Sequence, residues 1–213
     1  MKLDRRQLIA GTIATVALAT RAVGQEDPLV SAPSFVPPPP PPLPIDENKL
    51  RMIAHRELTR NRNAIWLKDM VGIADFTRPS SEPRFFLVDL VGGKVRPYLV
   101  AHGKGSDPEH EGVVRRFSNE FESFASSRGA YLTHTWYEGK HGLSMRLYGL
   151  DPDNSNAEAR AIVIHGAWYS NPDMIQKWGK LGRSDGCFAF PEANLMEIVA
   201  RLGPGRLLFA DKI

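Results

Sequence analysis

The 213-residue chain is 42% hydrophobic and 24% charged, which fits one globular domain with some additional sequence and excludes two full domains. Of its 27 basic and 24 acidic residues, four basic and one acidic lie in the first 24 positions, so the remaining chain carries 23 of each. A domain without net charge lacks the basic surface that nucleic acid requires, and we therefore exclude nucleic acid as a partner.

The N-terminus has the pattern of an export signal. Basic residues come first, and an apolar run over 8–19, too short to span a bilayer, leads to small residues at 22–24 that suit a cleavage site. The pair Arg5-Arg6 ahead of the run resembles a twin-arginine signal. We predict a signal peptide over residues 1–24, a periplasmic location and no transmembrane helix in the mature protein. An ordinary secretory signal and an uncleaved anchor are the alternatives, and both also place the domain outside the cytoplasm.

A proline-rich linker over residues 25–45 follows the signal. Six consecutive prolines, 37–42, have no amide donors and a fixed φ angle, so they favour an extended polyproline II conformation. Such a segment would act as a semi-rigid spacer. The alternative is a ligand for a proline-binding partner.

The folded domain is predicted over residues 46–213. Asp46 suits the N-cap of a helix whose apolar residues recur at helical spacing, and Pro191 opens a second helix that Gly203-Pro204 ends. The other segments are rich in β-branched and aromatic residues and are separated by Gly, Pro, Asn and Asp. The predicted strands are 72–76, 84–90, 95–101, 130–136, 143–150, 160–166 and 206–210. This pattern predicts a mainly β, sandwich or barrel-like domain with a few flanking helices.

Exported proteins usually keep cysteines because they form disulfides. Cys187 is the single cysteine of the chain and cannot form an internal disulfide. Gly186 before it leaves the backbone open to a substrate, and successive amides at such a turn can stabilise an oxyanion. His165, followed by Gly166, ends a predicted buried strand that would hold its ring over the sheet edge. A thiol beside an imidazole loses its proton readily and becomes a nucleophile. One interpretation is a cysteine-nucleophile enzyme, and the other is a buried structural cysteine with a structural histidine.

Two further histidines, His102 and His141, repeat the His-Gly dipeptide. His141 precedes a predicted strand that could line a groove at the thiol, so we expect it to contact substrate. The sequence has no zinc-ligand spacing and no phosphate-binding loop, and it therefore predicts neither a metal nor a cofactor.

The segment VIHGAWYSNPDMIQKWGKLGRSDGCFAFP, residues 163–191, combines a His-Gly strand end with the motif GRSxGC. It resembles the active-site segment of L,D-transpeptidase (YkuD-type) catalytic domains, and especially the branch described as murein L,D-transpeptidase catalytic-domain-like. The similarity extends upstream through SSRGAY and YEGKHGLSMRLYGL, and it covers about residues 70–211. The resemblance implies the β fold of that family.

The resemblance also implies a role for each residue of the motif. Cys187 matches the nucleophile and His165 the base, and the carbonyl of Gly166 matches the group that orients the imidazole. The amides of Gly186 and Cys187 would form the oxyanion hole, and Ser184 would shape the turn.

Three features near the motif bear on substrate and reactivity. Arg183 is the arginine of the motif and is expected to contact substrate or to lower the pKa of the thiol. Asp185 departs from the family, which has histidine or an aromatic residue there, and a carboxylate turned toward the thiol would raise its pKa. The aromatic loop 168–178, which fills the long gap between His165 and Cys187, is expected to form one wall of the cleft.

The resemblance implies a periplasmic cysteine peptidyltransferase that acts on peptidoglycan stem peptides without a cofactor. The thiol would attack a donor tetrapeptide, release D-alanine and form an acyl-enzyme that an amine resolves. Hydrolysis of the same acyl-enzyme by water is the first alternative. A catalytically silent wall-binding module and a thiol-redox protein are the others.

Overall fold

The computed structural model describes residues 41–213. The predicted signal peptide and most of the predicted linker lie outside the described residues. The last residues of the linker are held to the domain, because Arg78 donates hydrogen bonds to the carbonyls of Leu43 and Pro44 at 2.6 and 3.1 Å. Over the described part of the chain, no helix has the length and apolar character needed to cross a membrane.

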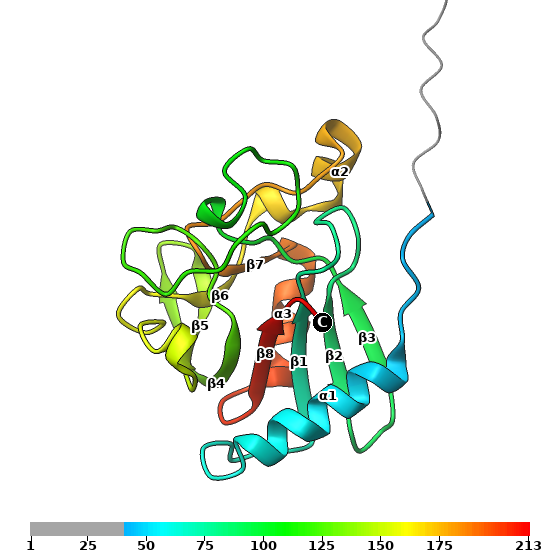
Figure 1. The fold of residues 1–213 in the computed structure, drawn as a ribbon, viewed down its shortest axis with the longest axis vertical. Helices are drawn as coiled ribbons and strands as arrows, with labels where there is room; N and C mark the ends of the chain where they lie inside the picture. The colour runs from blue at the N-terminus through cyan, green and yellow to red at the C-terminus, as the bar shows by residue number, and fades with distance from the viewer. Residues whose placement is uncertain (1–40) are drawn as a thin grey trace, which may run out of the picture. The chain divides into compact units, whose positions relative to one another are not determined.

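Eight strands form one mixed sheet in the order β3-β2-β1-β8-β4-β5-β6-β7 (Figure 1). The pairs β1–β8 and β6–β7 are parallel, and the other neighbours are antiparallel. An isolated bridge between Ala101, which follows β3, and Ala189 in β7 links the two edges of the sheet. The strands are β1 (Met70–Asp75), β2 (Phe85–Asp89), β3 (Val95–Tyr98), β4 (Gly129–Gly139), β5 (Gly142–Gly149), β6 (Val163–Gly166), β7 (Phe188–Phe190) and β8 (Leu207–Asp211).

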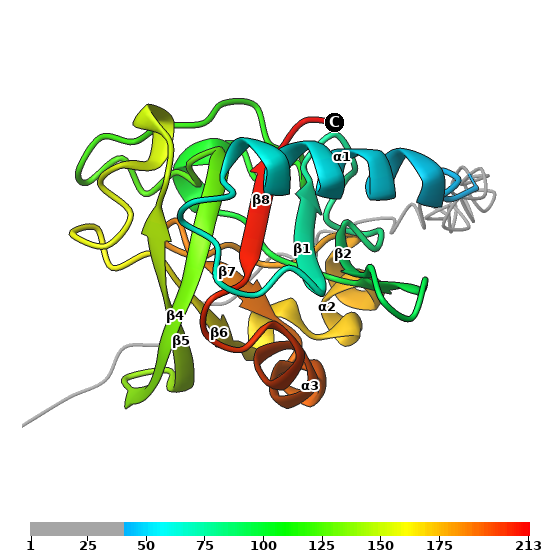
Figure 2. The same ribbon diagram turned by 90° about the horizontal axis from the view of Figure 1, so that it is seen from below.

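Two longer helices cover opposite faces of the sheet (Figure 2). Helix α1 (Glu47–Arg60) begins at Asp46, whose side chain accepts a hydrogen bond from the Lys49 amide at 2.9 Å, as expected for an N-cap. Helix α3 (Glu192–Leu202) follows β7 directly. Each helix buries its apolar stripe in a hydrophobic cluster with the strands, so the sheet is packed on both faces.

The prediction of a mainly β domain with flanking helices is confirmed. The strand predicted over 160–166 begins only at Val163, because the residues before it form a turn in which Ala161 has a φ of 54°. Helix α2 (Pro172–Trp178) was not predicted, although Pro172 at its start and Gly179, left-handed at its end, are recognisable helix signals. The short helical turns are Lys104–Ser106, Pro152–Asn154 and Trp168–Ser170.

Candidate active site

The parallel pairing of β6 with β7 brings the two candidate catalytic side chains to one face of the sheet. His165 pairs with Ala189, and Cys187 stands immediately before β7. Because side chains alternate along a strand, Cys187 and Ala189 point to the same side, which is also the side of His165. His165 is 1% exposed, whereas Cys187 is half-buried. The sheet therefore places a buried imidazole diagonally across from a partly accessible thiol.

The tautomer of His165 is fixed by its backbone. Nδ1 lies 2.9 Å from the carbonyl oxygen of Gly166. Since a carbonyl can only accept, Nδ1 carries the proton and Nε2 keeps a free lone pair. Burial lowers the pKa of His165 to about 4, so the ring is neutral near pH 7. A neutral imidazole with an unprotonated Nε2 can act as a general base.

The Cys187 thiol is also neutral in the resting state. Burial raises its pKa above the ordinary cysteine value. Its Sγ donates to the carbonyl oxygen of Ala161 at 3.4 Å rather than to the imidazole. The left-handed backbone of Ala161 presents this carbonyl to the thiol. To act as a nucleophile, the thiol would have to leave Ala161 and give up its proton, and a nearby base would promote that step.

The turn before the thiol requires glycine at position 186. Gly186 has a φ of 116°, and a Cβ there would lie 2.9 Å from the carbonyl oxygen of Ala125. Ser184 ties the turn together, since its hydroxyl donates to the Cys187 carbonyl at 2.7 Å and accepts from the Gly186 amide at 3.2 Å. The Gly186 amide, predicted to serve the oxyanion, is thus engaged by Ser184 in this structure.

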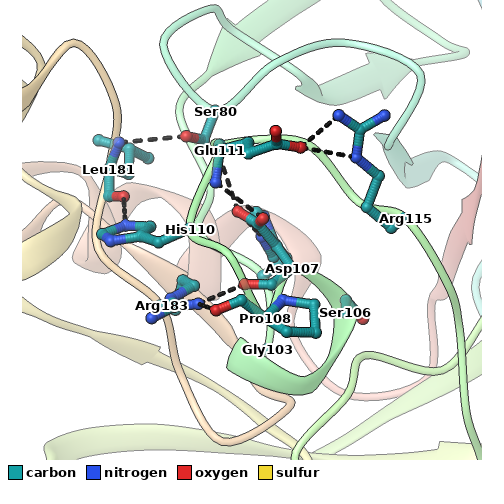
Figure 3. Close-up of polar contacts among 12 residues, drawn as sticks. Ser80, Gly103, Ser106, Asp107, Pro108, His110, Glu111, Arg115, Leu181 and Arg183 are labelled. Carbon is teal, nitrogen blue, oxygen red and sulfur yellow. Dashed lines mark hydrogen bonds and ion pairs between the residues drawn. The ribbon is translucent and has the colours of Figure 1, made fainter.

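Arg183 stabilises the turn through hydrogen bonds to the loop after β3. Its guanidinium donates to the carbonyl oxygens of Asp107 and Pro108, the latter at 3.0 Å (Figure 3). In the same view Leu181 is held by two contacts: its amide donates to Ser80 Oγ at 3.1 Å, and its carbonyl lies 2.9 Å from Nε2 of His110. The segment that carries Cys187 is therefore anchored to the loop after β3 and to Ser80.

A cavity of about 270 Å³ opens at the thiol. Asp185 lines it but points outward: its carboxylate is paired with Lys104 at 2.8 Å, and its side chain is 61% exposed. A larger groove of about 800 Å³ elsewhere contains no cysteine or histidine and is not the site of this chemistry. The residues lining the thiol cavity are Tyr137, Lys140, His141, Arg160, Ala161, Val163, His165, Tyr169, Arg183, Ser184, Asp185 and Cys187.

A family model for the L,D-transpeptidase catalytic domain matches residues 45–210. The protein belongs to the L,D-transpeptidase family. No curated protein matches the chain.

Among solved structures, an L,D-transpeptidase from Mycobacterium smegmatis aligns at 14% identity with a TM-score of 0.42, covering 67% of this chain and 58% of that one. L,D-transpeptidase 3 from Mycobacterium tuberculosis, solved in complex with a faropenem-derived adduct, aligns at 11% identity with a TM-score of 0.43, covering 67% of this chain and 60% of that one. The alignment thus spans less than two thirds of the length of both mycobacterial structures.

Next to the turn that precedes Cys187, this L,D-transpeptidase domain contains a buried polar cluster that the sequence analysis missed. Arg84 donates from Nη2 to Nδ1 of His102 at 2.7 Å, so Nε2 of His102 carries the proton and donates to Asp107 Oδ2 at 3.3 Å. All three side chains are almost wholly buried. The backbone of His102 continues the support, because its carbonyl accepts from the Ser184 amide at 2.9 Å. The repeated His-Gly dipeptide at 102 was the one signal that could have pointed to this cluster.

Arg160 was also missed. It lines the thiol cavity and donates to the carbonyls of Ser118 and Ala125, so it joins the 118–125 loop to the residues before β6. Its charge lowers the pKa of Cys187, against the larger effect of burial. No motif in the sequence marks Arg160.

The aromatic loop contributes less than predicted to the cavity. Tyr169 lines it, whereas Trp168 and Trp178 are exposed to solvent. Residues 41–213 contain no group of three or more histidine, cysteine or carboxylate side chains that could hold a metal ion.

Proposed function

We propose that this protein is an exported cysteine peptidyltransferase that acts on peptidoglycan stem peptides in the periplasm. The observation that carries the proposal is the neutral, backbone-fixed imidazole of His165, whose free Nε2 lies on the same sheet face as the Cys187 thiol beside an open cavity. Membership of the L,D-transpeptidase family supports the choice of substrate class.

In the first half-reaction, Cys187 Sγ attacks the carbonyl of the L-centre of diaminopimelate in a donor tetrapeptide while Nε2 of His165 takes the thiol proton. The Cys187 amide and, once released from Ser184, the Gly186 amide donate to the oxyanion. The C–N bond to the terminal D-alanine then breaks, and its amine leaves with the proton from His165. A thioester on Cys187 remains.

In the second half-reaction, an acceptor amine attacks the thioester carbonyl and loses a proton to His165. The C–S bond breaks, the sulfur leaves as thiolate, and the His165 proton returns to it. The cavity carries three cationic side chains, Lys140, Arg160 and Arg183, against the single carboxylate of Asp185. This excess of positive charge suits stem peptides, which carry several carboxylates.

The test is to incubate the purified protein with tetrapeptide muropeptides and to separate the products. Cross-linked dimers with release of D-alanine are expected, and Cys187→Ala should form none. If only shortened monomers appear, water resolves the acyl-enzyme, and the protein is a hydrolase and not a transferase.

A second arm uses meropenem and mass spectrometry of the intact protein. An adduct on Cys187 that is absent from Cys187→Ala is expected. Sacculus binding without an adduct would indicate a silent wall-binding module. Oxidation of the thiol without acylation would indicate a redox protein.

A further inference from the structure

His141 lies face to face with the proposed base. The two imidazole rings are stacked with their centroids 4.2 Å apart and their planes inclined by 20°. His141 belongs to the two-residue turn between β4 and β5, and Ser144, three residues later, pairs with His165 in β6. Gly142, with a φ of 71°, allows the tight turn that brings the ring back over His165. The stack is therefore built by the pairing of β5 with β6 and not by a flexible side chain alone.

The stack leaves the reactive atoms of His165 free. The Nδ1 proton of His165 is held by the Gly166 carbonyl in the plane of the ring. His141 covers one face of the His165 ring. The Nδ1–H bond and the Nε2 lone pair both lie in the plane of that ring, so the stack obstructs neither of them. A ring packed on that face limits rotation of the imidazole out of its hydrogen-bonding plane. This is the behaviour of a positioning group. The expectation that His141 contacts substrate stays a prediction.

Two stacked imidazoles that are both protonated form an unfavourable pair, because like charges at this separation repel strongly. His141 is exposed whereas His165 is 1% exposed, so a proton placed on His141 keeps more of its hydration. His141 is therefore the first of the pair to be protonated as the pH falls. Once charged, it opposes the imidazolium that His165 must form when it takes the thiol proton.

Other charges around the pair come from several elements. Lys140 in the same turn disfavours a proton on either ring, and Asp185 in the nucleophile turn favours one on His141. The remaining titratable or charged groups that line the cavity are Tyr137, Arg160, Tyr169, Arg183 and Cys187.

We propose that His141 is the positioning residue of His165, and that protonation of His141 sets the acid limit of acylation. The second part rests on the peptidyltransferase proposed above. The pair takes up protons as a coupled unit, with the first proton on His141.

The test measures the rate of meropenem acylation against pH for the wild type, His141→Phe and His141→Ala. Phe keeps a stacked ring but cannot be charged, so its acid limb should move to lower pH by about one unit with a similar plateau. Ala removes the ring, and the plateau rate should fall about tenfold because the base loses its alignment. His134→Phe is the matched control. His134 lies on β4, where it packs against Tyr148 with the ring planes tilted by 51°, and it does not line the thiol cavity, so the profile of this variant should equal that of the wild type. An unmoved acid limb in His141→Phe would overturn the proposal.

A second measurement does not depend on turnover or on the folding of a His141 variant. In the Cys187→Ala protein, the two imidazoles are followed by NMR as the pH is lowered. His141 should take up its proton at higher pH, and His165 should titrate only after it, with a curve broadened by the coupling. Independent curves, or earlier protonation of His165, would contradict the proposal. If the wild type is not acylated at any pH, the peptidyltransferase proposal fails, and the NMR titration still tests the coupling of the pair.

Discussion

Two buried histidines, each followed by glycine, have opposite chemistry in this protein. At the end of β6, His165 donates from Nδ1 to the Gly166 carbonyl and keeps Nε2 as an acceptor. In the loop after β3, His102 accepts at Nδ1 from the Arg84 guanidinium and donates from Nε2 to Asp107. Both rings are 1% exposed, and burial lowers the pKa of both. Because both rings are equally buried, burial does not distinguish them. The partner of Nδ1 decides which ring can act as a base.

The surroundings of the two rings also differ. His102 has polar partners on both nitrogens and is enclosed by protein, so it has no free position for a proton from substrate. His165 has one engaged nitrogen and borders the thiol cavity. Three substitution or pH experiments separate the proposed chemical role of His165 from the structural role of His102.

The largest effect is expected for His165→Ala. Removing the base should lower the rate of meropenem acylation by roughly 10²- to 10⁴-fold. Stopped-flow mixing with detection of the intact adduct measures this rate. Cys187→Ala, which has no thiol to acylate, gives the background signal. Retention of near wild-type acylation by His165→Ala would show that another group activates the thiol.

His102→Ala should act on stability instead. The substitution leaves the buried Arg84 guanidinium and the Asp107 carboxylate without the ring that joins them, which should lower the free energy of unfolding by about 3 kcal/mol. Urea unfolding followed by circular dichroism measures this loss. The acylation rate per folded molecule should stay within a few-fold of the wild type. A stable His102→Ala protein with abolished acylation would contradict the assignment.

The smallest effect concerns the pH dependence of stability. The pKa of His165 falls from 6.5 to about 4 on folding, and that of His102 falls from 6.5 to about 3. Between these values the unfolded chain binds protons that the folded protein does not bind, so stability falls as the pH is lowered below 6.5. Each histidine contributes up to about 1.4 kcal/mol per pH unit. Urea unfolding at pH 7, 6 and 5 should show a shallower decline for His165→Ala than for the wild type, and equal slopes would contradict the shift.

The local signals in the sequence predicted most of the fold. The N-cap at Asp46, the apolar spacing of α1 and the β-branched segments are short-range patterns, and the structure places a helix or strand at each of them. The strand predicted from 160 was too long, because the left-handed Ala161 turn that carries the thiol acceptor carbonyl cannot be recognised from an alanine in the sequence. The order of the strands also could not be predicted, since it depends on which distant segments pair.

The sequence by itself determined the candidate reactive residues: a lone cysteine in a Ser-x-Gly-Cys turn, and a His-Gly pair at the end of a buried strand. These features are local, because a turn or a strand end is specified by a few adjacent residues. Only the tertiary structure decided which His-Gly histidine is free to accept a proton, that His141 stacks on His165, and that Arg183 braces the turn. The Arg84 contact that occupies His102, the His141–His165 stack and the Arg183 contacts all join segments that are far apart in the chain, and the fold brings those segments together.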